Sequence, residues 1–502
     1  MNKNIITKNK EVLLWIDKFI VIFFIISSLY SFLIYWNLLE SRDAAVYMYT
    51  GKLLRKGMVP YLDIWDHKTP GIYIYYSVLY FFSENIRHSA LFCMIAAQIF
   101  TTISLFKLLL KFYSKKLAAS SIILLLILYN WLLGKEGPYL IEEYIIFFQV
   151  ITLWLLFNWE RSLKYFLVGI LCALSFLLKP TLISLWVAIF ILWLFEFFKN
   201  KNYNAFLKIL FLTFVGFVIP FLFVGYFFWS KGALLDLIDQ SFFYNSIYVS
   251  NTFRFNDFFL GFSNVLFINF FVLPAWFYIC WLYISKKISL SSNILLAISV
   301  LAFPFEIYIS SLSGNSYPHY YYSSLLFDVI IIAAFINFII KYVSIPKWMG
   351  YLSNLTSIFL FFLLITVITY NLLYRIPKLE QANNEKIDLI NYLNDNNFSN
   401  KFCLVFGNEL WVYLNTNVNP IDRYVYQYPL FKKGYRSDRI WEEFLTDFKF
   451  KRPAIFIDTN NPEMNDSLFE LKKNYLVELR EIIQRDYVLE RKINNYSIYK
   501  LK

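Results

Sequence analysis

Residues that could do chemistry are concentrated in the polar segment that follows the first apolar run. They form two short runs, Arg42-Asp43 and Asp66-His67-Lys68. A carboxylate a few residues beyond a hydrophobic run is uncommon and often functional, so Asp43 is a candidate general base that could activate a hydroxyl group. The structural alternative for Asp43 is an ion pair with Arg42 or Lys68.

Lys68 lies two residues before Pro70, a residue that can open a helix at its first turn. The amphipathic stretch 72–82 that follows is too short to span a membrane, so we expect it to lie along the interface. Lys68 would then stand beside a helix N-terminus, where backbone N–H groups and a cation together favour a phosphate. The sequence predicts a lipid-linked phosphate as the ligand. The alternative is an ordinary contact with lipid headgroups.

Two later segments carry further polar side chains. Glu142 and Glu143 could share a general-base task, a divalent cation or the orientation of a sugar with Asp43. For at least one of them, the better interpretation is structural, because an acid in a first helical turn is favourable without any catalytic purpose. His319 and Tyr320 lie in a tyrosine-rich stretch at an apolar boundary, where they could hydrogen-bond a sugar or a phosphate.

The elements that must position these residues are membrane helices. Of 502 residues, 59% are hydrophobic and 16% are charged, whereas soluble proteins have about 45–50% apolar and about 25% charged residues. Apolar runs recur up to residue 373, and at roughly 20 residues per span they predict about eleven transmembrane helices. The runs are 19–39, 90–110, 117–133, 144–158, 165–178, 181–198, 207–228, 261–283, 293–312, 321–341 and 351–373.

Lysine and arginine predict the orientation of these spans. The net charge of +12 lies in short basic clusters between the apolar runs, which indicates topology and lipid contacts rather than a nucleic-acid partner. With a cytoplasmic N-terminus, most basic residues of the later short loops are cytoplasmic, as the positive-inside rule requires. This assignment depends on a tight outer turn at Lys179-Pro180. The segment 40–89 and the C-terminal region would then lie outside the cytoplasm, at the plasma membrane.

The C-terminal region, residues 376–502, is polar and differs from the rest of the chain. Its sequence contains an amphipathic helical pattern, two strand-like runs and a hairpin: 383–396, 402–406, 454–458, and 487–501 turning at Asn494-Asn495. We predict a small extracytoplasmic α/β domain there, after a transmembrane domain that covers residues 1–375.

Several motifs follow one another in a characteristic order. They are Arg42-Asp43, Gly57-x-x-Pro60-Tyr61-x-Asp63, Asp66-His67-Lys68-Thr69-Pro70-Gly71, Glu142-Glu143-Tyr144, Leu178-Lys179-Pro180, and Ser313-Gly314 with His319-Tyr320. This order resembles bacterial GT-C glycosyltransferases, over most of residues 1–330. The nearest group is the family 39-like enzymes, relatives of protein O-mannosyltransferases and of the aminoarabinose transferase of lipid A.

The resemblance implies an all-α polytopic membrane fold of the GT-C type with a catalytic aspartate, here Asp43. It also implies a polyprenyl-phosphate sugar donor with Lys68 as a phosphate ligand, and a second acid at Glu142 or Glu143. Some relatives bind a divalent cation, but no Asp-x-Asp motif occurs in the second loop, so metal dependence stays open. The residues that we assign to substrate binding are Arg42, Asp66, His67, Lys68, His319 and Tyr320.

The predicted reaction is an inverting transfer to a glycan, lipid or protein acceptor, in which Asp43 orients or deprotonates the acceptor hydroxyl while Lys68 stabilises the leaving phosphate. No nucleotide-binding signature occurs, which fits a lipid-phosphate donor. Two other classes stay open. A lipid or glycan transporter should carry paired polar residues deep within its spans. A lipid-linked glycan polymerase or ligase should depend on arginines in a large late outer loop.

Overall fold

The computed structural model describes residues 21–34, 36, 38–136, 138–252, 266–289, 293–312, 317–342, 349–396, 398–431, 435–460 and 473–502. The chain forms two compact units, each made of segments that are distant in sequence. Unit 1 comprises Met1–Asn37, Leu91–Phe223 and Phe253–Ile376, and unit 2 comprises Leu38–Ala90, Val224–Thr252 and Pro377–Lys502. The predicted division into a transmembrane domain of residues 1–375 and a C-terminal domain of residues 376–502 stays a prediction.

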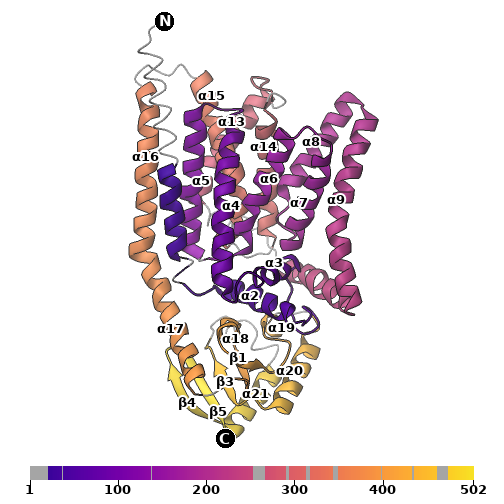
Figure 1. The fold of residues 1–502 in the computed structure, drawn as a ribbon, viewed down its shortest axis with the longest axis vertical. Coiled ribbons are helices and arrows are strands. Elements are labelled where there is room, and N and C mark those ends of the chain that lie inside the picture. Colours follow the sequence, from indigo (N-terminus) through magenta and orange to yellow (C-terminus); the bar gives the residue numbers. More distant parts are fainter. Residues whose placement is uncertain are drawn as a thin grey trace. The chain divides into compact units, whose positions relative to one another are not determined.

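Unit 1 is a bundle of helices (Figure 1). After a helix at Val21–Ile34, it contains α4 (Ile86–Leu109), α5 (Lys115–Glu136), η1 (Ile141–Tyr144), α6 (Ile145–Asn158), α7 (Leu163–Leu178), α8 (Ser184–Asn200), α9 (Tyr203–Ser230), α13 (Leu266–Ile284), α14 (Ile294–Ser311), η4 (Pro318–Ser324), α15 (Leu325–Tyr342), α16 (Met349–Tyr370) and η5 (Asn371–Arg375). Each apolar run identified in the sequence overlaps one of these helices.

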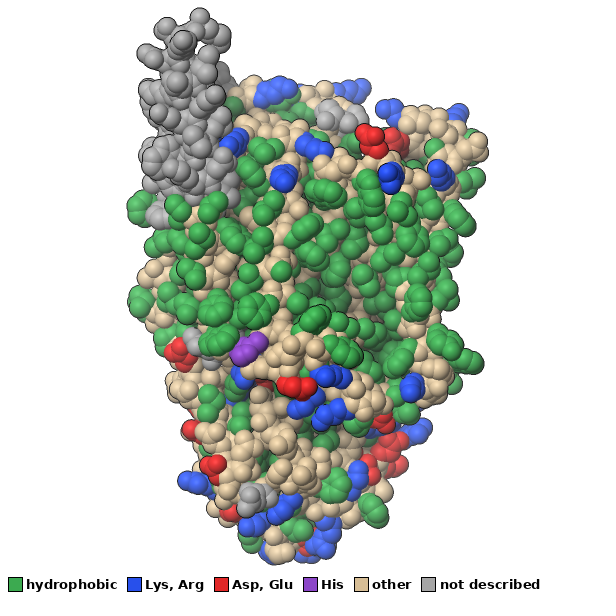
Figure 2. All heavy atoms as spheres, viewed as in Figure 1, with side chains coloured by type: hydrophobic (Ala, Val, Ile, Leu, Met, Phe, Trp, Pro, Cys, Tyr) green, Lys and Arg blue, Asp and Glu red, His purple; other side chains and the backbone are tan. Residues whose placement is uncertain are grey.

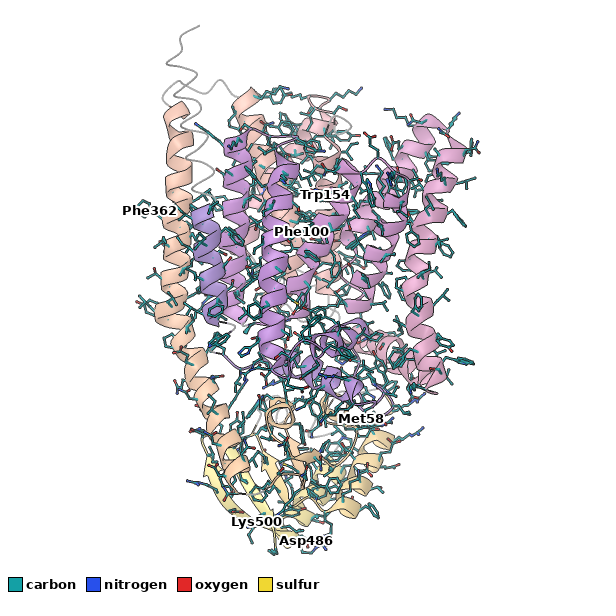
Figure 3. All side chains as sticks on the ribbon, in the orientation of Figure 1. Met58, Phe100, Trp154, Phe362, Asp486 and Lys500 are labelled. Carbon is teal, nitrogen blue, oxygen red and sulfur yellow. The ribbon has the colours of Figure 1, made fainter. Side chains whose placement is uncertain are left out.

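The bundle exposes apolar side chains on its outside. Phe100, Trp154 and Phe362 are exposed (Figure 3), and hydrophobic side chains cover much of the bundle face seen in Figure 2. Within the described residues, seven helices are long and apolar enough to cross a membrane, and three shorter apolar helices accompany them. Such a surface is stable in lipid rather than in water. The number of about eleven spans stays a prediction.

Consecutive helices of unit 1 run in opposite directions, so alternate loops lie at the same end of the bundle (Figure 1). The Nζ of Lys111, after α4, donates to the carbonyl of Phe157 near the end of α6, 2.9 Å away. Lys and Arg side chains gather at this end (Figure 2). The turn at Lys179-Pro180 is confirmed, because α7 ends at Leu178 and α8 begins at Ser184. Which end faces the cytoplasm stays a prediction.

Unit 2 is built on a five-stranded sheet with the strand order β2-β1-β3-β5-β4. The strands are β1 (Phe402–Phe406), β2 (Asn419–Pro420), β3 (Ile455–Asp458), β4 (Tyr487–Ile493) and β5 (Tyr496–Leu501). β1 pairs in parallel with β2 and β3, and β5 pairs antiparallel with β3 and β4. The predicted strands and hairpin are confirmed, and Asn494 takes the left-handed conformation (φ 50°) that the tight turn needs.

Helices accompany this sheet in the same unit. From the C-terminal region come α17 (Ile376–Asp395), α18 (Trp411–Asn415), α19 (Tyr428–Phe431), α20 (Ser437–Lys451) and α21 (Lys473–Asp486). The polar segment near the N-terminus adds α2 (Arg42–Arg55) and α3 (Gly71–Leu79), and the middle of the chain adds α10 (Leu234–Ile238), the π-helical turn η2 (Asp239–Phe243) and α11 (Tyr244–Thr252). The expected short helix at 72–82 is α3.

Close packing joins α2 to α3. A Cβ atom at Gly51 of α2 would lie 2.7 Å from the Cβ of Tyr76 on α3, so only glycine fits at this crossing. Polar contacts join α2 to the C-terminal region: Arg42 forms an ion pair with Glu409 at 3.0 Å, and the Nζ of Lys52 donates to the carbonyl of Leu414 at 3.3 Å. The polar segment near the N-terminus therefore folds together with the C-terminal region.

Candidate active site

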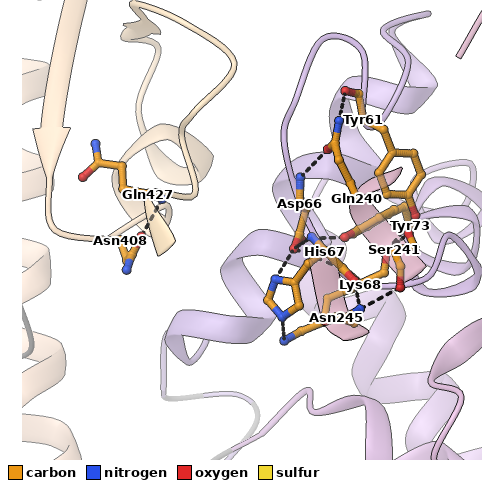
Figure 4. Close-up of polar contacts among 10 residues, drawn as sticks. All are labelled: Tyr61, Asp66, His67, Lys68, Tyr73, Gln240, Ser241, Asn245, Asn408 and Gln427. Carbon is orange, nitrogen blue, oxygen red and sulfur yellow. Dashed lines mark hydrogen bonds and ion pairs between the residues drawn. The ribbon is translucent and has the colours of Figure 1, made fainter. Parts of the chain in front are cut away.

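Asp66, His67 and Lys68 lie in a chain of polar contacts in unit 2 (Figure 4). Oδ1 of Asp66 lies 3.4 Å from Nδ1 of His67, and Nε2 of His67 lies 3.3 Å from Nζ of Lys68. Since an ammonium group can only donate, Nε2 of His67 is the acceptor in its contact with Lys68. The lysine is thus held at the end of an ordered chain.

The carboxylate of Asp66 organises the backbone around it. Oδ1 accepts from the backbone N–H groups of His67 (2.6 Å) and Lys68 (3.3 Å), and Oδ2 accepts from the hydroxyl of Tyr73 on α3 (2.5 Å). Burial raises the pKa of Asp66 above its ordinary value, although Lys68 and these hydrogen bonds act in the opposite direction. Asp66 is therefore suited to shaping the loop, with its oxygens already occupied.

Side chains from η2 and α11 hold this loop in place. The Nε2 of Gln240 donates to the carbonyl of Tyr61 (2.7 Å), and its Oε1 accepts from the N–H of Asp66 (3.3 Å). Two further bonds run from Asn245 Nδ2 to the carbonyl of His67 (2.7 Å) and from Ser241 Oγ to the carbonyl of Lys68 (3.0 Å). These supporting residues lie between the apolar runs 207–228 and 261–283. Nothing in the composition of that segment indicated that its side chains would support the site.

Lys68 lies just before the N-terminus of α3. The helix begins at Gly71 after Pro70, and the Lys68 residue is partly exposed. Between them, Thr69 is 2% exposed, and its Oγ1 is buried without a hydrogen-bond partner in the described part of the chain. A buried hydroxyl without a partner normally costs free energy, so its presence beside a cation and a helix N-terminus points to a ligand.

Asp43 lies in the first turn of α2, whose N-cap Ser41 accepts from the N–H of Ala44 at 3.3 Å. No hydrogen bond or ion pair of Asp43 is found among the described residues, so the ion pair expected as its structural alternative is absent there. Arg42 instead pairs with Glu409. Asp43 and Asp66 both lie within electrostatic reach of Tyr426, which places all three in one region of unit 2.

In unit 1, Glu142 and Tyr320 meet at Lys179. The Nζ of Lys179 lies 2.6 Å from Oε1 of Glu142 and 3.6 Å from the ring centroid of Tyr320. Glu142 also interacts electrostatically with His319, whose ring stacks on Tyr317. Sequence reasoning used Lys179 as a topological marker and as part of a family motif, and it assigned this lysine no role in the site. The neighbouring motif Ser313-Gly314 lies outside the described residues.

Glu143 has a different environment. Its Oε1 accepts from the backbone N–H of Leu140 at 2.9 Å, and its Oε2 accepts from the hydroxyl of Tyr129 at 3.3 Å. Glu143 is 4% exposed, and both oxygens bond within the helical bundle. These contacts fit the structural role expected for one of the two adjacent glutamates, because the side chain caps its own 3-10 turn.

Unit 1 contains two buried acids that sequence reasoning missed, Glu306 on α14 and Asp328 on α15. Glu306 accepts hydrogen bonds from Ser184, Ser310 and Ser323. Asp328 accepts from Ser324 at 3.0 Å, while its Oδ1 is buried without a partner among the described residues. A single acid within an apolar run is the signal that could have revealed each of them.

Metal binding by these acids has no support from the described geometry. Within the described residues, no group of three or more His, Cys, Asp or Glu side chains could hold a metal ion.

No family model matches the chain, and no curated protein does. Among solved structures, the chain is similar to an oligosaccharyltransferase of Archaeoglobus fulgidus, crystallised as a complex with zinc and sulfate. The match has 14% sequence identity and a TM-score of 0.45, and it covers 87% of this chain and 67% of that chain.

Proposed function

We propose that the protein is a membrane glycosyltransferase of the GT-C type that moves a sugar from a polyprenyl-phosphate donor to a cell-surface glycan, lipid or protein. One observation carries the proposal: an acid without a partner in the described part of the chain, Asp43, lies in the same region of unit 2 as the ordered Lys68. A transfer from a lipid phosphate needs one group to accept the hydroxyl proton and another to stabilise the leaving phosphate.

In the proposed mechanism, the phosphate of the donor binds Lys68 beside the N-terminus of α3. The carboxylate of Asp43 accepts the proton of the acceptor hydroxyl as its oxygen attacks the anomeric carbon. The bond from that carbon to the phosphate oxygen breaks, and the leaving phosphate takes the electron pair. Lys68 stabilises the charge that grows there, and the contact with His67 fixes its position.

The purified protein in lipid nanodiscs tests this function. It is given a polyprenyl-phosphate sugar labelled in the sugar, together with acceptors from the cell envelope. We expect the label to move to the acceptor, with release of polyprenyl phosphate. Release of polyprenyl pyrophosphate from a diphosphate-linked donor, without use of the monophosphate donor, would instead assign a polymerase or ligase.

A transporter is the second candidate function, and the buried acids of unit 1 favour it. Glu306, with its three serine partners, and Asp328 are fully buried in apolar helices, which is where transporters place polar residues. In the nanodisc experiment, a transporter would leave the labelled donor intact. In sealed vesicles, it would move the labelled lipid between leaflets without cleaving it.

The proposed site faces the outside of the plasma membrane. Alkaline phosphatase fused after residue 380 should be active, since that enzyme needs an extracytoplasmic location. An inactive phosphatase, together with a fluorescent green fluorescent protein at the same position, would place the C-terminal region in the cytoplasm.

A further inference from the structure

Two tyrosines of the C-terminal region pack against His67 of the candidate site. The ring of His67 stacks on Tyr426 at 5.6 Å with an interplanar angle of 25°, and on Tyr428 at 6.1 Å with an angle of 21°. The two tyrosine rings also stack on each other at 5.7 Å. Near them, the backbone N–H of Trp65 donates to the carbonyl of Arg423 at 2.9 Å. The C-terminal region thus forms one wall around the imidazole.

Gln427 anchors this tyrosine pair to the end of β1. Its side chain donates to the carbonyl of Val405 (2.8 Å) and accepts from the N–H of Gly407 (2.9 Å), and its own N–H donates to Oδ1 of Asn408 (2.6 Å; Figure 4). Gln427 is fully buried. Tyr426 is therefore held by the sheet of unit 2, rather than by a loop free to move away from His67.

Tyr426 is 6% exposed, and its hydroxyl, for which no hydrogen bond is found among the described residues, is not one of the fully buried atoms, so a ligand can reach it. Burial first, and then the charges of Asp43 and Asp66, raise the pKa of Tyr426 well above its ordinary value. The phenol therefore keeps its proton and acts as a hydrogen-bond donor. Because the ring of Tyr426 stacks on His67, which itself contacts Lys68, this accessible donor lies beside the lysine segment, where it can donate to a ligand of Lys68.

We propose that Tyr426 binds the donor substrate, with its hydroxyl donating a hydrogen bond to an oxygen of the lipid phosphate that Lys68 also contacts. This assignment rests on the proposed function. It gives the C-terminal region a direct part in the site, because that region would supply one ligand of the phosphate while the segment near the N-terminus supplies the other. Neutral donors and ammonium groups both favour anionic phosphate oxygens.

Binding of a long-chain polyprenyl phosphate to the full-length protein in phosphatidylcholine nanodiscs tests the assignment. We expect Tyr426→Phe to weaken binding by about ten-fold, the size typical of a lost hydrogen bond to a charged group. The substitution keeps the ring that stacks on His67, so it removes only the hydroxyl. Tyr435→Phe is the matched control, since Tyr435 is also 6% exposed and lies in the same unit. It should bind as the parent does.

The possible outcomes separate the two proposals. If Tyr426→Phe binds normally while Lys68→Ala is weakened, Tyr426 is not a phosphate ligand and the proposed function stands. If only Tyr426→Leu is weakened, the ring acts through packing and the assignment is wrong. Competition by added phosphatidylglycerol would assign the site to ordinary headgroups and overturn it. If the parent protein binds no polyprenyl phosphate, the proposed function falls together with this assignment.

Discussion

Three acids of unit 1, Glu142, Glu143 and Glu306, differ from the acid on α2 of unit 2 in whether their carboxylates have partners. In unit 1, Glu142 pairs with Lys179, Glu143 accepts from a backbone N–H and a tyrosine, and Glu306 accepts from serines. In unit 2, Asp43 has no such partner among the described residues. A buried acid whose oxygens are occupied stabilises the fold, whereas an acid without a partner can accept a proton from a substrate. Acidic side chains therefore have a structural role in unit 1 and a proposed catalytic role in unit 2.

The largest effect should follow the substitution Asp43→Asn. Asparagine keeps the size of the side chain but cannot accept the proton, so we expect the rate of sugar transfer to fall by about 10²–10⁴-fold. Donor binding and the amount of protein in the membrane should stay normal. Initial rates at saturating donor measure the effect, with Asp395→Asn, an exposed acid at the end of α17, as the control. A near-parental rate would show that Asp43 is not the base.

Glu142→Gln tests whether a paired acid of unit 1 stabilises the fold. Removing one partner of a buried ion pair leaves the other charge uncompensated, which costs about 3–5 kcal/mol. We expect a lower midpoint of thermal unfolding and less folded protein, with a normal rate per folded molecule. The double variant Glu142→Gln/Lys179→Met should recover much of the stability. A stable Glu142→Gln protein with a low transfer rate would instead make Glu142 part of the catalytic machinery, as the sequence motif implies.

A smaller effect is expected for Lys68→Ala. A charge-assisted contact to phosphate is worth about 1.5–3 kcal/mol, so donor use should fall by about ten-fold or more, mainly through a higher KM. Steady-state kinetics with varied donor concentration measure the change. The exposed Lys56, at the end of α2, serves as the control position for the same substitution. Unchanged donor kinetics would return Lys68 to an ordinary contact with lipid headgroups.

The smallest expected effect is on stability. It concerns Asp422, an acid of unit 2 that is not part of the candidate site. Burial raises the pKa of Asp422 to about 7 from its ordinary 3.8, and its Oδ2 lacks a partner among the described residues. The folded state holds this proton more tightly than the unfolded state. The contribution of Asp422 to stability therefore decreases as pH rises from about 4 to about 7.

The variant Asp422→Asn stays neutral at every pH. We expect it to be more stable than the parent at pH 8 by about 1–3 kcal/mol, and to lose less stability between pH 5 and pH 8. Thermal unfolding across this pH range measures both effects. Parallel curves for the two proteins would show that Asp422 does not titrate in this window.

The sequence predicted the elements better than it predicted the contacts between them. Apolar runs identified the helices of unit 1 because a membrane helix needs many consecutive apolar residues, and alternation with Asn494-Asn495 identified the terminal hairpin. The helix α2 was not predicted, since its residues Arg42–Arg55 mix polar, aromatic and apolar side chains without a clear period. Local patterns therefore identified elements only where the pattern was strong.

The candidate site was predicted only in part. Asp43 and Lys68 were identified from their place beside apolar runs and a proline. Their surroundings come from distant parts of the chain: Gln240 lies 174 residues after Asp66, and Tyr426 comes from the C-terminal region. A single sequence cannot show which of its acids find a partner at such distances. The pairing of Glu142 with Lys179, 37 residues later, illustrates the same difficulty within unit 1.

Unit 2 draws its residues from near both ends of the chain, and this has a consequence for how the protein matures. The ribosome releases Asp66, His67 and Lys68 early, and their aromatic neighbours Tyr426 and Tyr428 are made much later. The early segment therefore makes its contacts with residues 377–502 only after these have been synthesised. A nascent chain interrupted before that point lacks the two tyrosines that pack against His67.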